Sequence, residues 1–133
     1  MEIIKHYIVT FLVFFAIDIV WLGIVAKKLY KENLSHLMAD STNWTAAIIF
    51  YALFIGGLIF FAINPALKKD SIIYAISIGA LFGFMTYATY DMTNLATLKD
   101  WPLKITIIDI IWGTTLNALT AGISFYIIKL IDK

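Results

Sequence analysis

The stretch ITIIDIIWGTTLNALTAGISFYII, residues Ile105–Ile128, is almost wholly apolar yet carries an aspartate, Asp109, close to its start. A helix rises about 1.5 Å per residue, so one of this length crosses the ~30 Å hydrocarbon core of a bilayer. At about 100° per residue, its polar and small residues fall within an arc of about 80°. They are Asp109, Gly113, Asn117, Thr120 and Ser124. The stretch therefore predicts a transmembrane helix whose polar stripe faces protein or an aqueous pocket.

The composition of the whole chain indicates an integral membrane protein. Its 133 residues are 62% hydrophobic and 14% charged, with a mean hydropathy of +0.89. A soluble domain is about 45–50% apolar and about 25% charged, so this chain cannot cover its core with polar surface. The net charge is +1 and the sequence has no arginine, which argues against nucleic acid as a partner. Cysteine is absent, which excludes disulfides and thiolate metal sites.

The order of apolar stretches predicts an all-α membrane protein, a four-transmembrane-helix bundle with both termini on the same side. We expect a single integral-membrane domain over residues 1–133. The expected spans are about 7–25, 45–63, 71–90 and 105–128. We expect Asn64-Pro65 to end the second span. The first connector, residues 29–44, is either a short interfacial helix or a solvated loop, and Asp40 to Asn43 offer N-cap chemistry for the next helix. Five lysines fall on each side, so the positive-inside rule does not orient the chain.

Three acids of the predicted spans converge on one membrane face. Asp18 is in the second half of the first span, Asp91 is at the end of the third, and Asp109 is at the start of the fourth. Alternating helix directions place all three toward the face away from the termini. An acid in lipid costs about 2.5–3.5 kcal/mol on insertion scales and usually serves a function, so we expect a shared pocket.

A short motif occurs twice, as Asp18-Ile-Val-Trp21 and Asp109-Ile-Ile-Trp112. The i,i+3 spacing predicts that each indole lies beside its own carboxylate, and the two motifs would form two walls of one pocket. The alternative for the acids is structural: a protonated or hydrogen-bonded carboxyl that ties helices together through Asn117 or a tyrosine hydroxyl.

The aromatic residues have a structural alternative as well. We expect Trp44 and Trp101 to belong to an interfacial belt, whereas Tyr87 and Tyr90 fit either the belt or the pocket. His36 is expected to be a solvated loop residue, because no second histidine or cysteine supports a metal site.

Three runs resemble one bacterial family. They are AIDIVWLGIVAKKLY (16–30), FGFMTYATYDMTNLATLKDWPLK (82–104) and DIIWGT (109–114). They are similar to the membrane family catalogued as domain of unknown function 2177, and the resemblance covers nearly the whole chain. It implies a small multi-pass protein, expected in the bacterial plasma (inner) membrane, and carries no assigned activity. The matching motif positions are Asp18, Trp21, Tyr90, Asp91, Thr93, Asn94, Asp109 and Trp112.

Three functions fit these patterns. The first is an acidic, aromatic-lined intramembrane pocket that binds or transports a cation, a proton or a lipid-like molecule, in a homo-oligomer with Gly79-x-x-x-Gly83 as a candidate seam. The second is an accessory subunit of another membrane protein. The third is a membrane-embedded enzyme acting on a lipid, with His36 or Tyr90 assisting two acids, although no catalytic motif is present. The predicted ligand-binding residues are Asp18, Trp21, Tyr87, Tyr90, Asp91, Asn94, Asp109, Trp112 and Asn117.

Overall fold

Four long helical segments make up the protein in a computed structural model that describes residues 2–132. Each is long and apolar enough to cross a membrane, which confirms the predicted all-α, four-span class. Their bounds are Glu2–Leu37, Trp44–Lys69, Ile72–Thr97 and Leu103–Ile131. Each helix is longer than its apolar stretch, because the polar residues at its ends continue the backbone hydrogen-bond pattern.

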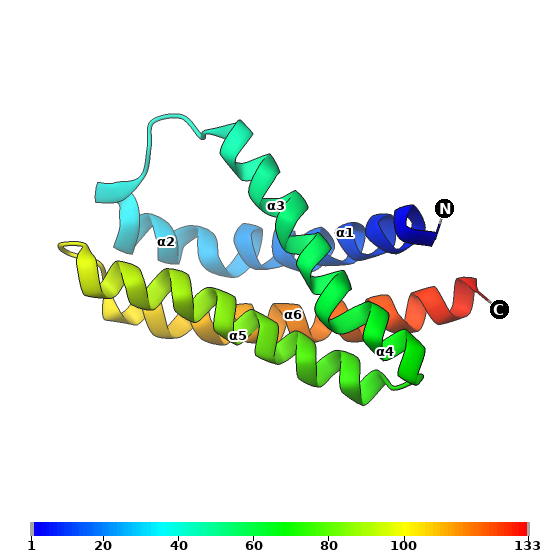
Figure 1. The fold of residues 1–133 in the computed structure, drawn as a ribbon. Coiled ribbons are helices and arrows are strands. Elements are labelled where there is room, and N and C mark those ends of the chain that lie inside the picture. The colour runs from blue at the N-terminus through cyan, green and yellow to red at the C-terminus, as the bar shows by residue number, and fades with distance from the viewer. Residues whose placement is uncertain (1, 133) are drawn as a thin grey trace.

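The first segment is one nearly continuous rod. Helix α1 (Glu2–Val20) passes through a π-helical turn (Trp21–Ala26) into α2 (Lys27–Leu34), and a 3₁₀ turn (Ser35–Leu37) ends it. The first half of the connector is therefore helical and continues the first span (Figure 1). Residues 38–43 form the loop to the next helix.

The second segment combines α3 (Trp44–Leu58), a π-helical stretch (Ile59–Ile63) and α4 (Asn64–Lys69). The Asn43 side chain accepts a hydrogen bond from the Ala46 N–H at 3.1 Å, so the expected N-cap lies at the last of the four candidate residues. The prediction that Asn64-Pro65 ends this span is wrong. Pro65 occupies the first turn of α4, where its missing N–H costs little, and the helix stops only at Asp70, in the left-handed region with φ 51°.

Helices α5 (Ile72–Thr97) and α6 (Leu103–Ile131) form the most closely packed pair. A Cβ atom built on Gly79 would lie 2.7 Å from both the Ala121 Cβ and the Asn117 carbonyl oxygen. The predicted close approach at the glycines of α5 therefore exists, but the neighbour is α6 of the same chain. This face is covered, which removes the seam that the sequence offered to a second copy.

Helix α3 contacts the bundle along only part of its length. Figure 1 shows α3 leaning away from the other helices toward its N-terminal end, while the π-helical stretch and α4 that follow it pack beside α5. Its buried residues, Phe54, Ile55 and Leu58, lie in the second half. A Cβ atom on Gly56 would meet no atom within 4 Å, so no other helix of residues 2–132 packs closely against α3 at this glycine.

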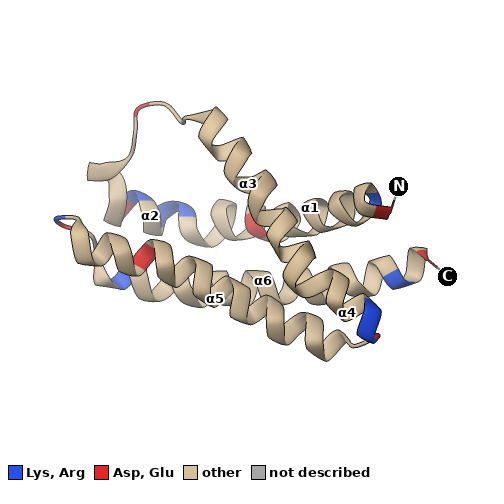
Figure 2. Ribbon diagram, in the orientation of Figure 1, with Lys and Arg blue, Asp and Glu red and all other residues tan. Residues whose placement is uncertain are grey.

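The two chain ends lie at the same end of the bundle (Figure 1). Lys5 of α1 forms an ion pair with Asp132, just after α6, which ties the two helices there. Charged residues gather toward the two ends of the bundle, and only a few lie along its middle (Figure 2). That distribution is the one expected for helices that cross a hydrocarbon layer.

Candidate functional site

Tyr30 reaches the acidic site because of the π-helical turn in the first segment. In an uninterrupted α-helix, Tyr30 would lie about 120° around the axis from Asp18, at about 100° per residue. A π-helical turn accommodates one extra residue, which rotates the following helix back by about that one step. Tyr30 on α2 therefore faces the same neighbour, α6, as Asp18 on α1.

A hydrogen-bonded chain connects Asp109 to the first segment. The Tyr30 hydroxyl donates to the Asp109 carboxylate oxygen Oδ1 at 2.6 Å. The Trp21 indole N–H in turn points to the Tyr30 oxygen at 3.4 Å, a longer and weaker contact. Asp109 is 9% exposed, so it accepts a short hydrogen bond in a largely dry environment, where such a bond is strong.

The two Asp-x-x-Trp motifs contact each other crosswise. The Trp112 indole N–H donates to Asp18 Oδ1 at 3.3 Å, and the rings of Trp21 and Trp112 stack with centroids 4.4 Å apart at 9°. Each indole is therefore connected to the acid of the other motif. Trp112 bonds to Asp18 directly, and Trp21 contacts Asp109 through the Tyr30 hydroxyl. The i,i+3 spacing predicts an indole beside its own carboxylate on one helix face; the hydrogen bond to the acid of the other motif is a further contact, which the packing of α1 on α6 creates.

Asp91 on α5 is fully buried, and neither of its carboxylate oxygens has a hydrogen-bond donor among the described residues. Asp109 of α6 lies opposite Asp91, because Tyr87, one turn before Asp91, packs against Gly113, one turn after Asp109, but no hydrogen bond joins the two carboxyl groups. Two ionised carboxylates only accept hydrogen bonds, so a bond between them requires a proton on one. A pair of this kind either shares a proton or waits for a cation or a donor.

A pocket of about 390 Å³ opens beside this acid pair, between α3, α5 and α6. The pocket is lined mostly by aromatic side chains, and one carboxyl group lies at its end. The residues are Phe50, Phe54, Thr86, Tyr87, Tyr90 and Asp109. The Phe54 ring packs against Phe50 at 5.4 Å and edge-on against Tyr87 at 6.3 Å between centroids, so the aromatic wall is continuous.

The structure brings most of the predicted site residues into one region. Asp109, Tyr87 and Tyr90 line the pocket itself. Asp18, Trp21 and Trp112 belong to the crossed pair of motifs, and Asp91 adjoins Asp109.

Two predicted residues lie elsewhere within the described chain. Asn117 is fully buried under α5, and its amide donates to the Gly113 carbonyl at 2.7 Å. Asn94 is half-buried one turn after Tyr90 and does not line the pocket formed by residues 2–132.

The two tryptophans expected in the interfacial belt differ. Trp44 is 69% exposed, as a belt residue would be, whereas Trp101 is 9% exposed. The Trp101 indole N–H donates to the Thr106 hydroxyl at 3.0 Å, and its ring meets Tyr90 edge-on at 5.9 Å. Trp101 therefore packs behind Tyr90 within the protein, and its assignment to the belt was wrong. His36 is exposed and contacts the Asp100 carbonyl, which joins the first connector to the α5–α6 loop.

Three site residues escape the sequence patterns. Tyr30 lies off the Asp18 face at regular helical spacing, so only the π-helical turn brings it in. Phe50 and Phe54 belong to an apolar span with no polar landmark, and the tilt of α3 alone sets them against the acids. The one sequence feature that marks Tyr30 is its position about one turn after the pair Lys27-Lys28.

Tyr30→Phe is expected to lower the free energy of unfolding by about 1–2 kcal/mol, because it leaves the Asp109 oxygen without a donor and the Trp21 N–H without an acceptor. Thermal unfolding in detergent measures this loss, and near-ultraviolet circular dichroism reports the stacked indoles. The matched control is Tyr126→Phe, since Tyr126 is 58% exposed. Equal stability of the two variants would contradict a structural role for the Tyr30 hydroxyl.

No group of three His, Cys, Asp or Glu side chains lies close enough to hold a metal ion within residues 2–132. Comparison with curated proteins and comparison with solved structures both found no match. A family match, by contrast, spans residues 3–126 and includes both Asp-x-x-Trp motifs, the acid pair and most of every helix. The chain therefore belongs to the family described as Predicted membrane protein (DUF2177).

Proposed function

We propose that the protein binds a lipid-like molecule with a cationic head group in the aromatic pocket beside Asp91 and Asp109. The observation that carries the proposal is the arrangement of this pocket: rings form its walls, the carboxyl group of Asp109 forms its end, and Asp91 is fully buried and does not line it. Aromatic faces attract an ammonium group by cation–π interaction, and a carboxylate binds it by charge.

The charge balance of the site favours a positively charged ligand. The ion pairs of residues 2–132 are Lys5–Asp132, Lys28–Glu32 and Lys129–Asp70, all with partly or fully exposed partners. Asp18, Asp91 and Asp109 have no lysine partner in this set. Trp112 and Tyr30 donate hydrogen bonds to Asp18 and Asp109, but no described residue supplies a positive charge to any of the three acids, and a ligand amine would supply it.

The position of the pocket favours a ligand that arrives from the bilayer. Its outer wall includes Phe50 and Tyr90, whose side chains are 51% and 56% exposed on helices that cross the membrane. Because these two rings are exposed on the outer surface of the helices, acyl chains can reach them without passing through the core. A volume of about 390 Å³ is at the lower end of the range for small-molecule sites and suits a head group with its first methylenes.

Asp109→Asn is expected to weaken binding of dodecylamine at least tenfold, about 1.4 kcal/mol, because the variant keeps the shape of the site but removes its negative charge. The protein is reconstituted in lipid nanodiscs and titrated with dodecylamine, and tryptophan fluorescence is the readout. Glu32→Gln is the matched control, because Glu32 is an exposed acid of α2 in a surface ion pair with Lys28.

The neutral analogue dodecanol separates recognition of charge from partitioning into the lipid. The proposal requires that dodecylamine bind more tightly than dodecanol in the native protein and that this preference vanish in Asp109→Asn. Equal binding of both probes, or an Asp109→Asn variant that binds dodecylamine as the native protein does, would reject it.

The proposal places the protein in a bacterial inner membrane, with both termini on one side of it. The start of α1 and the end of α6 lie together, which supports termini on one side of the membrane. The family description supports a location in a membrane. Assembly into a homo-oligomer stays a prediction, and the open side of α3 at Gly56 is a surface that suits it.

A further inference from the structure

The buried residues of α1 recur at intervals of four and are mostly polar. They are His6, Thr10, Phe14 and Asp18. The lipid-facing sides of the same helix are apolar, so its polar side chains face the interior of the bundle. In a membrane protein such an inward stripe marks a hydrogen-bonded contact or a hydrated path.

Helix α6 presents a matching stripe. Asn117, Thr120 and Ser124 are fully buried, and each has a side-chain oxygen with no hydrogen-bond partner among the described residues. The same holds for the Thr10 hydroxyl and for His6 Nε2 on α1. An unpartnered buried polar atom costs about 1–3 kcal/mol, so five in one protein core require an explanation.

Contacts near both ends of α1 set the two stripes against one another. Trp112 of α6 donates to Asp18 of α1, and Lys5 of α1 pairs with Asp132 at the end of α6. The helices are therefore antiparallel neighbours. The residues that carry the five unpartnered atoms lie between these two contacts along α1 and α6, and one of them, Asn117, packs against Gly83 of α5. We call this set of buried polar residues the seam.

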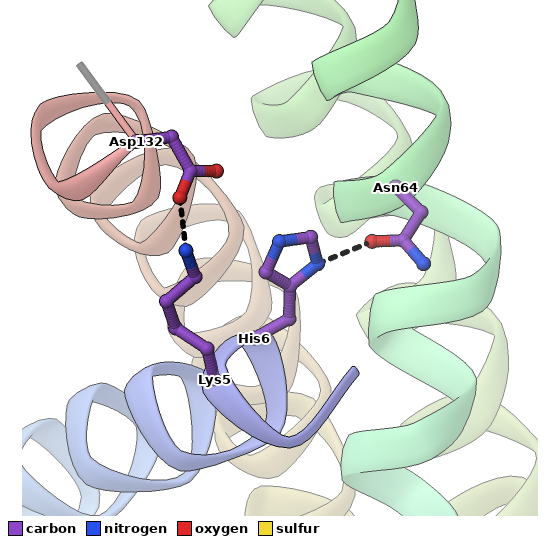
Figure 3. Close-up of polar contacts among 4 residues, drawn as sticks. All are labelled: Lys5, His6, Asn64 and Asp132. Carbon is purple, nitrogen blue, oxygen red and sulfur yellow. Dashed lines mark hydrogen bonds and ion pairs between the residues drawn. The ribbon is translucent and has the colours of Figure 1, made fainter. Parts of the chain in front are cut away.

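His6 forms the outer end of the seam (Figure 3). Its Nδ1 lies 3.0 Å from the Asn64 oxygen Oδ1, while Lys5 beside it turns toward Asp132. Because Asn64 Oδ1 accepts, Nδ1 carries the hydrogen and Nε2 presents a lone pair to the interior. A pocket of about 290 Å³, lined by His6, Asn64, Glu2 and Lys68 among others, opens this end to the surface.

We propose that this seam is a hydrated proton pathway between Asp18, in the acid site, and His6, at the end of the bundle that carries both termini. Water is the small molecule that satisfies isolated hydroxyls in a protein interior, with two to four hydrogen bonds each. Threonine and serine hydroxyls both donate and accept, so hydroxyls with intervening water form a relay. The inference is independent of the proposed amine ligand.

The relay transfers protons with no net change in bonding. A proton passes to a water or hydroxyl oxygen, and that group releases its own proton to the next acceptor. At the outer end, His6 Nε2 accepts the proton and Nδ1 releases one to water in the surface pocket, and rotation of the imidazole ring restores the Nδ1–H···Asn64 hydrogen bond before the next transfer. Phe14 interrupts the polar stripe of α1 between Thr10 and Asp18, so α6, through Thr120 and Asn117, must carry the relay past that level.

The test compares two threonines of α6. Thr120→Val removes a buried hydroxyl without changing the side-chain shape, and Thr115→Val is the control, because Thr115 is exposed and its hydroxyl already bonds to the Ile111 carbonyl at 2.9 Å. Proteoliposomes with an entrapped pH-sensitive dye are driven by a potassium diffusion potential with valinomycin. We expect proton uptake above that of protein-free liposomes, reduced at least fivefold in Thr120→Val and unchanged in Thr115→Val.

Thr120→Val should fold, since it replaces an unpartnered hydroxyl by a methyl group, and thermal unfolding should show equal or greater stability. Ser124→Ala gives an independent reduction at a second position of the seam. Uptake equal to that of protein-free liposomes would overturn the proposal, and so would full uptake in a stable Thr120→Val protein. Neither result would bear on binding of dodecylamine.

Discussion

Gly83→Ala is expected to lower the free energy of unfolding by about 3 kcal/mol, because α5 and α6 touch at this residue. A Cβ atom there would overlap the Gly113 carbonyl oxygen and approach the Asn117 Cβ to 2.8 Å. Backbone cannot rotate away as a side chain can, so the two helices must separate. Separation would also move Asp91 from Asp109, and we expect dodecylamine binding to fall with stability.

The matched control for this variant is Gly56→Ala. Gly56 also lies in a transmembrane helix, yet a Cβ atom there would meet nothing within 4 Å. Alanine is the better helix former by about 0.5–1 kcal/mol, so Gly56→Ala should be neutral or slightly stabilising. Unfolding of both variants in mild detergent, followed by circular dichroism, gives the comparison. A Gly83→Ala protein as stable as Gly56→Ala would contradict the close packing of α5 on α6.

The fold was largely predictable because lipid imposes a simple rule on sequence. A span needs about 20 apolar residues, and the chain has four such stretches, so helix number and type follow. The exact helix ends did not follow, because polar residues such as Lys27 and Lys28 continue a helix beyond the apolar core. The predicted helix end at Asn64-Pro65 failed for a related reason, because a proline in the first turn of a helix does not terminate that helix.

The candidate site was predictable in its depth but not in its contacts. Alternating helix directions place Asp18, Asp91 and Asp109 toward one end of the bundle. In the structure Trp112 bonds to Asp18 and Tyr30 bonds to Asp109, while Asp91 has no hydrogen-bond partner among the described residues. Which indole meets which acid depends on how α1 and α6 are rotated, and sequence spacing alone does not determine that rotation. The π-helical turn that turns Tyr30 inward has no signature in the residues Trp21–Ala26.

Asp91→Asn is expected to stabilise the protein and to impair its proposed function. The native Asp91 carboxylate is fully buried and faces another acid. An amide of nearly the same shape removes one buried acid and supplies an N–H donor to Asp109, which we expect to raise the free energy of unfolding by about 1–2 kcal/mol. Dodecylamine, in contrast, loses one of two acids that attract its ammonium group, and its affinity should fall at least tenfold.

The opposite signs of these two effects identify Asp91 as a ligand group, because a residue kept for packing alone would lose stability when changed. Asp100→Asn is the control, since Asp100 is exposed in the α5–α6 loop and its left-handed φ of 58° suits asparagine equally well. That variant should change neither quantity. If Asp91→Asn instead lowers stability and leaves dodecylamine binding intact, the buried acid pair is a structural tie between α5 and α6. The ligand amine would then have to be assigned to the Asp109 side of the pocket alone.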